Sequence, residues 1–211
     1  MDGARAASGA VSPSSGIPVS IPEEERLRAD VYGMLARALA APPDAALLDA
    51  LAMLSGDDSE IGGAFRALAR AATATTAEAV AREYHDLFIG LGRGELLPYA
   101  SYYLTGFLHE KPLADLRGAL AKLGIERAGG IKEPEDHIAS LCDVMAGLIA
   151  GGFGAPAPLA VQQEFFAAFL APWAERFFHD LETAQAALLY AAIGRIGRLF
   201  LGVEHTAFAI A

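Results

Sequence analysis

The residues whose types and spacing best suit chemistry lie in one short segment, Glu133-Pro134-Glu135-Asp136-His137. Proline suits the first position of a helix, so we expect a helix that begins at Pro134 with two acids in its first turn. On that helix Glu133 lies close to both Asp136 and His137. Nearby carboxylates favour a protonated imidazole, so we expect a raised pKa for a partly buried His137. The segment is therefore a candidate functional site.

The same segment also fits a purely structural role and, less well, a metal site. Many helices begin with proline and acids, and a histidine at the margin of an apolar face is usually structural. A di-iron bundle needs Glu-x-x-His on two helices and two further glutamates. Glu133 and His137 are one residue too far apart for that motif, and the sequence contains no second copy. We expect no metal site here, and a structural helix start remains an alternative.

A glycine-rich stretch from Gly90 to Tyr99 is the second candidate, because such loops can hold phosphate groups. The Gly-Lys-Ser/Thr sequence of phosphate loops is absent, and the preceding residues predict a helix rather than a strand. A nucleotide site is therefore not expected. The stretch ends in Leu96, Leu97, Pro98 and Tyr99, apolar residues that either fold back on the core or contact a ligand. The residues alone leave both outcomes open.

Apolar residues recur at helical spacing along most of the chain, and no run alternates with the two-residue period of a strand. The pattern predicts an all-α protein, a single compact bundle of about nine or ten helices. We expect a disordered tail over residues 1–21 and one helical domain over residues 22–211. The expected helices cover residues 22–40, 45–54, 60–72, 76–88, 100–109, 112–123, 134–150, a stretch around 165–170, a helix from 172, and 183–201.

Local signals mark several ends of these helices. Asp44 and Thr76 are residues that cap helix N-termini, and Gly124 suits a left-handed residue after a helix C-terminus. The expected helix boundaries depend on these residues.

The aromatic residues between Phe165 and Phe178 recur at helical spacing and are expected in the core. Gly194, Gly197 and Gly202 are expected to let the last helix approach its neighbours closely, since glycine has no side chain. Cys142 lies on an apolar helix face and is expected to be a buried thiol.

Composition excludes several classes of protein. The formal net charge of −10 and the lack of a Lys/Arg cluster argue against binding duplex nucleic acid. The single cysteine cannot form an intramolecular disulfide, and no Cys/His spacing resembles a zinc site. The mean hydropathy is +0.33, but the most apolar stretch, residues 186–203, is interrupted by Arg195 and Arg198. We expect no stable membrane insertion, no secretion signal and a cytoplasmic location.

Three segments, in order along the chain, carry a family resemblance. They are Tyr84-His-Asp-Leu-Phe-Ile-Gly90 with Leu97-Pro-Tyr-Ala-Ser-Tyr-Tyr-Leu104, then Glu133-Pro-Glu-Asp-His137, then Phe165-Phe-Ala-Ala-Phe-Leu-Ala-Pro-Trp-Ala-Glu-Arg-Phe-Phe178. Together they resemble the TorD/DmsD/NarJ family of all-helical cytoplasmic chaperones for molybdenum enzymes. The resemblance covers about residues 24–208, and the form of the segment from Arg93 to Tyr99 looks most like members associated with formate dehydrogenases.

The resemblance implies a protein without catalytic turnover and without a cofactor of its own. Such chaperones bind the N-terminal leader or N-terminal region of an apo-molybdoenzyme until its cofactor is inserted, and they delay twin-arginine export until then. The implied partner is the apo catalytic subunit of a molybdenum oxidoreductase, bound by a monomer or a homodimer. The family positions implicated in leader binding match Tyr84, Leu87, Phe88, Pro98, Tyr99, Asp136 and His137.

The two arginines of a twin-arginine leader need acceptors, and Glu133 and Asp136 are expected to supply charge-assisted pairs. The sequence departs from the family at Pro98-Tyr99-Ala100-Ser101, where many members have Pro-Trp-Gly-Ser, so the pocket there is altered. The N-terminal tail also lies outside the family pattern. A helical carboxylate-metal oxidoreductase and a generic helical interaction module remain the alternatives.

Overall fold

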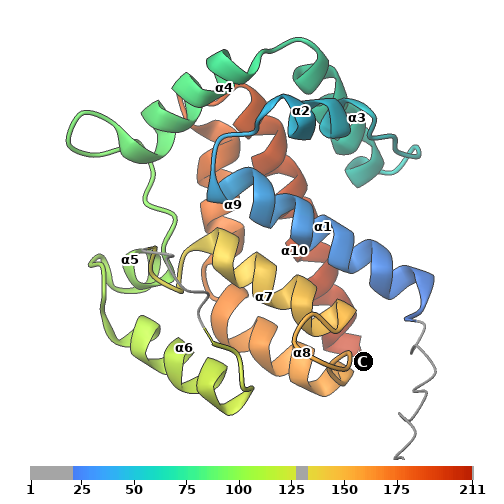
Figure 1. The fold of residues 1–211 in the computed structure, drawn as a ribbon, viewed down its shortest axis with the longest axis vertical. Coiled ribbons are helices and arrows are strands. Elements are labelled where there is room, and N and C mark those ends of the chain that lie inside the picture. The colour runs from blue at the N-terminus through green and yellow to red at the C-terminus, as the bar shows by residue number, and fades with distance from the viewer. Residues whose placement is uncertain (1–20, 127–132, 211) are drawn as a thin grey trace, which may run out of the picture.

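The structure, a computed structural model, describes residues 21–126 and 133–210 (Figure 1). The described residues form ten α-helices and two π-helical segments, and their only bridge of β type is the isolated pair Tyr99–His137. The all-α prediction is confirmed. The elements are α1 Glu23–Ala40, α2 Ala45–Ala52, α3 Glu60–Thr73, α4 Ala77–Tyr84, η1 His85–Ile89, α5 Ala100–Thr105, α6 Lys111–Lys122, α7 Ile138–Ala150, α8 Leu159–Phe165, η2 Phe166–Leu170, α9 Ala174–Thr183 and α10 Leu189–Ile210.

The disordered tail expected over residues 1–21 lies outside the described residues except for Ile21, and the single domain expected over 22–211 stays a prediction. None of the helices in the described part of the chain is both long and apolar enough to cross a membrane.

Three helix–helix packings form the centre of the fold. α1 packs along α7, and α10 packs against both α9 and α3. Figure 1 shows α2, α3 and α4 together at one end of the molecule, with α6 and α8 at the other. Among the aromatic residues expected in the core, all but Phe169 are buried. Cys142 is a free, fully buried thiol as expected, and burial raises its pKa.

Two of the three glycines in α10 explain the close approach of α9. A Cβ atom on Gly194 would lie 2.5 Å from the backbone nitrogen of Glu182, and one on Gly197 would lie 2.3 Å from Cδ1 of Phe178. The same expectation is wrong for Gly202, because a Cβ there would meet nothing within 4 Å.

Several local signals at the helix ends are confirmed. The carboxylate of Asp44 accepts a hydrogen bond from the backbone N–H of Leu47 at 2.8 Å, and the hydroxyl of Thr76 accepts one from Ala79 at 3.3 Å. Gly124 follows α6 in the left-handed conformation, with φ of 68°. These caps act within one turn, so the sequence could predict them.

Several predicted boundaries are wrong. The last helix begins at Leu189 rather than Thr183, and the carboxylate of the distant Glu83 accepts hydrogen bonds at its start from the N–H groups of residues 188, 189 and 190. The helix expected over 100–109 ends at Thr105, where Gly106 takes a left-handed φ of 83°.

The helix expected to begin at Pro134 begins instead at Ile138, with His137 as its N-cap. The first acids therefore lie in the preceding loop and not in a helical turn. The backbone of this loop pairs with a distant segment, as described below, and so it is not free to continue the helix.

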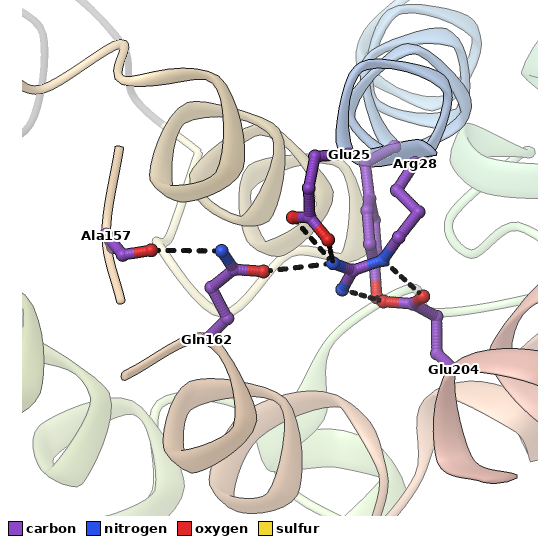
Figure 2. Close-up of polar contacts among 6 residues, drawn as sticks. Glu25, Arg28, Ala157, Gln162 and Glu204 are labelled. Carbon is purple, nitrogen blue, oxygen red and sulfur yellow. Dashed lines mark hydrogen bonds and ion pairs between the residues drawn. The ribbon is translucent and has the colours of Figure 1, made fainter. Parts of the chain in front are cut away.

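A partly buried ionic cluster joins α1, α8 and α10 (Figure 2). Arg28 donates to both oxygens of Glu204, at 2.7 and 2.8 Å, and to Glu25 and Gln162. Tyr32 donates a further hydrogen bond to Glu204 at 3.1 Å. Burial on its own lowers the pKa of Arg28, but the hydrogen bonds and charges of Glu204 and Glu25 raise it above its ordinary value. The cluster fixes α1 against the C-terminal half of the chain.

Candidate functional site

A cavity of about 550 Å³ lies between the C-terminal part of α1, the end of η1 and the start of α7. Six of the eight residues predicted from the sequence line it, namely Tyr84, Phe88, Pro98, Tyr99, Glu133 and His137. The remaining lining residues are two charged side chains, Arg37 and Asp143, and a set of small or apolar ones, Ala36, Ala40, Ile89, Ala139 and Ser140. Segments that are far apart in the sequence thus share one cavity.

Backbone pairing brings the two motif segments together. Tyr99 and His137 form an isolated antiparallel bridge. On either side of it, the N–H of Ile138 donates to the carbonyl of Pro98 at 2.9 Å, and the N–H of Ala100 donates to the carbonyl of Asp136 at 3.0 Å. The bridge places the Tyr99 ring edge-on to the His137 imidazole, with 5.1 Å between their centres. The relative position of these two rings is therefore set by main-chain hydrogen bonds.

Asp136 does not line the cavity. The residue is only 1 % exposed, and its Oδ2 accepts a hydrogen bond from the backbone N–H of Ser101 at 2.9 Å. Ser101 is in the first turn of α5, and the residue that precedes this helix, Tyr99, supplies no side-chain cap. Asp136 therefore caps α5 from a distant segment. This position differs from the ligand-facing one that the sequence suggested.

Leu87 is fully buried and is also absent from the lining of the cavity. It packs in the hydrophobic core, and its carbonyl accepts a hydrogen bond from the N–H of Leu96 at 2.8 Å. Both Leu87 and Asp136 thus support the residues that face the cavity.

His137 is neutral, contrary to the expectation of a raised pKa. The residue is 6 % exposed, and burial lowers its pKa to about 4, although Glu133 and Asp136 act in the opposite direction. The loss of hydration outweighs the two carboxylates because the ring is almost wholly enclosed. Its Nδ1 accepts a hydrogen bond from the N–H of Ala139 at 3.1 Å, so the single ring proton is on Nε2.

Glu133 lies at the exposed edge of the cavity, where the hydroxyl of Tyr99 donates a hydrogen bond to its carboxylate. Burial, followed by this hydrogen bond, raises the pKa of Tyr99. The rings of Tyr84 and Phe88, which also line the cavity, contact each other with 4.9 Å between their centres, and both contact Tyr190 of the core. The aromatic wall is therefore anchored to α10.

The glycine-rich stretch forms a tight loop that returns the chain to the cavity. Gly90 and Gly92 take positive φ angles of 60° and 96°, and the N–H of Glu95 donates to the carbonyl of Asp86 at 3.2 Å. Of the apolar residues left open by the sequence, Leu96 packs against the core, whereas Pro98 and Tyr99 line the cavity. The first outcome therefore holds for Leu96, and contact of Pro98 and Tyr99 with a ligand stays a prediction.

Sequence reasoning missed Arg37 and Asp143. Arg37 lies on α1 and Asp143 on α7, both are exposed, and neither has an ion pair within residues 21–126 and 133–210. Asp143 follows Ala139 by four residues, so the two share a helix face. The four-residue spacing from Ala139, at the start of α7, was the sequence signal that could have pointed to Asp143.

Across the described residues, no three His, Cys, Asp or Glu side chains come together as ligands of a metal ion would.

Comparison with known proteins gives a consistent set of similarities. Residues 55–179 match the family model described as nitrate reductase delta subunit. The chain is 34 % identical over 112 residues to the chaperone protein TorD of Vibrio atlanticus. This similarity covers 48 % of this chain and 52 % of that protein. The chain is also 31 % identical over 129 residues to the chaperone protein TorD of Vibrio cholerae. This second similarity covers 58 % of this chain and 59 % of that protein.

The chain therefore spans little more than half the length of these curated relatives. Among solved structures, it is similar to a protein from Archaeoglobus fulgidus described as a putative redox enzyme maturation protein, with a TM-score of 0.54 and 20 % identity. That similarity covers 89 % of this chain and 99 % of the other, and it shows a shared fold.

Proposed function

The chain belongs to the nitrate reductase delta subunit family, the TorD/DmsD/NarJ family indicated by its motifs, and we propose that it is a chaperone for a molybdenum oxidoreductase. It binds the N-terminal leader of the apo catalytic subunit and holds it in the cytoplasm until the molybdenum cofactor is inserted. It has no catalytic turnover of its own. A single observation carries the proposal: six motif residues from three separate segments line one cavity.

The chemistry of the cavity supports a peptide ligand that has both apolar and cationic parts. Tyr84, Phe88 and Pro98 offer an apolar wall, and Glu133 offers a carboxylate at the edge. A twin-arginine leader has two guanidinium groups followed by an apolar run, which matches this combination. The net charge of −10 speeds the encounter with such a basic peptide more than it sets the affinity.

One short segment of the sequence indicates which enzyme the chaperone serves. The segment from Arg93 to Tyr99 looks most like members associated with formate dehydrogenases, so we propose a formate dehydrogenase as the client. Where the client is exported, binding of its leader delays the twin-arginine pathway until assembly is complete.

The direct test measures binding of fluorescent N-terminal peptides from each molybdenum-enzyme catalytic subunit encoded in the source genome. A bulky side chain in the cavity should weaken binding. Ala40 is an exposed lining residue, so Ala40→Phe would place a phenyl ring there. Ala50→Phe places the same ring on an exposed position of α2 outside the cavity and is the matched control. We expect at least about a tenfold loss for the first variant alone, since a ring in the cavity excludes the peptide.

Two results would contradict the proposal. One is that the wild-type protein binds none of the leaders, and the other is that Ala40→Phe and Ala50→Phe bind equally well. If a leader does bind, capture of the client from its native host, with identification of the large subunit, would name the enzyme that is served.

A further inference from the structure

Two carboxylates in the cavity have no cationic partner among the described residues, namely Glu133 and Asp143. Asp143 has no hydrogen bond or ion pair within the described ranges, and Glu133 accepts only the hydroxyl proton of Tyr99 there. Asp136, the acid expected to bind a guanidinium, is instead enclosed and holds the start of α5. The carboxylates available to a bound cation are therefore Glu133 and Asp143.

His137 supplies the same cavity with a hydrogen-bond donor that the fold leaves unpaired. His137 is more than nine-tenths buried, and its Nδ1 is occupied by the N–H of Ala139. Its Nε2 has no hydrogen-bond partner in the described residues, and it is not among the enclosed unpartnered atoms, which are Ser101 Oγ and Asp136 Oδ1. Because His137 lines the cavity, its Nε2–H faces the space that a ligand would fill. This donor suits a main-chain carbonyl.

Arg37 places a positive charge on the α1 side of the same cavity. It has no carboxylate partner within residues 21–126 and 133–210, so its charge repels a cationic ligand. The two helices thus carry opposite signs, with Arg37 on α1 and Asp143 on α7. A cationic group is therefore attracted to the α7 side and excluded from the α1 side.

We propose that Asp143 and Glu133 bind the arginines of the leader peptide at the α7 side of the cavity, while the Nε2–H of His137 donates to a main-chain carbonyl of the same peptide. This assignment rests on the proposed function, since it names the groups that read the leader. Asp143 and Glu133 together then distinguish an arginine-bearing leader from an apolar peptide without arginine.

The test compares two peptides with two variants. The peptides are the leader that wild-type protein binds best among those of the host, and the same leader with its paired arginines replaced by glutamine. Asp143→Asn should bind the arginine leader about threefold to fivefold more weakly, the range for an exposed ion pair, and should bind the glutamine leader as wild type does. Asp49→Asn removes one exposed acid from α2, outside the cavity, and should leave both affinities unchanged.

Arg37→Gln should have the opposite effect and strengthen binding of the arginine leader by about twofold to fourfold, because a like charge is removed. Both differences should shrink at high salt, which screens exposed charges. His137→Asn keeps an N-cap acceptor but lacks the Nε2–H. It should bind both leaders about threefold to tenfold more weakly at an unchanged unfolding midpoint, as expected for a lost buried hydrogen bond.

The results that would contradict the arginine assignment differ from the result that would contradict the proposed function. If wild type binds both leaders equally well, or if Asp143→Asn weakens both equally, the leader site stands and the arginine assignment is overturned. An equal effect of Asp49→Asn also overturns it, because the charge then acts at long range. If wild type binds neither leader, the proposed function fails and the assignment fails with it.

Discussion

Replacing Asp136 by alanine should destabilise the protein through α5, and leader binding should change little while the fold is intact. The carboxylate Oδ2 accepts the N–H of Ser101 at 2.9 Å, and both residues are buried. Loss of a helix cap costs about 1 kcal/mol, and a buried N–H without an acceptor costs about 1–3 kcal/mol. Both estimates describe the loss of the same hydrogen bond, so they are not simply added, and we expect the free energy of unfolding to fall by about 2–3 kcal/mol.

Asparagine at the same position separates a structural role from a binding role. The amide oxygen of Asp136→Asn can still accept the hydrogen bond from Ser101, so this variant should lose less than about 1 kcal/mol. If Asp136 instead contacted a guanidinium, asparagine would keep the stability and lose affinity, because the charge would be missing.

The assay is urea unfolding followed by circular dichroism, together with leader binding measured well below the unfolding transition. A loss of about 2–3 kcal/mol in the alanine variant corresponds to a drop in Tm of about 4–12 °C for a domain of this size. Equal stability of the alanine and asparagine variants would refute the capping argument. So would a leader affinity that falls more than about threefold, roughly what a lost exposed ion pair costs, in the asparagine variant while its stability is unchanged.

Three further predictions follow from packing and burial. His137 has a pKa of about 4 in the folded state against an ordinary 6.5, so stability should fall by about 3 kcal/mol as the pH drops through this window. His137→Asn should lose that part of the pH dependence in urea titrations at several pH values. Gly197→Ala should cost about 2 kcal/mol because its Cβ would overlap a phenyl ring of α9, whereas Gly202→Ala, in open space, should gain up to about 1 kcal/mol by thermal unfolding. Arg28→Met should cost about 3 kcal/mol because it leaves Glu204 buried and unpaired, and adding Glu204→Gln should recover much of that loss in a double-mutant cycle.

Much of the fold could be predicted from local sequence. The periodic apolar residues of α1 and α7, the caps at Asp44 and Thr76, and the left-handed Gly124 each act within a few residues of one another. Such features need no knowledge of the rest of the chain. The starts of α10 and α5 are different, because Glu83 and Asp136 cap them from distant segments.

For the candidate site, the sequence by itself determined which residue types were available and which family they indicate. It could not determine their environments, since hydration and exposure depend on what packs around each side chain. Only the tertiary structure decided that His137 is neutral and that Asp136 is enclosed. The physical reason is the same in both cases, because both residues lie where two distant segments pair, at Tyr99 and His137, and both are buried there away from water. The tertiary structure also places the exposed Asp143 in the cavity, a position to which the motif gave no pointer.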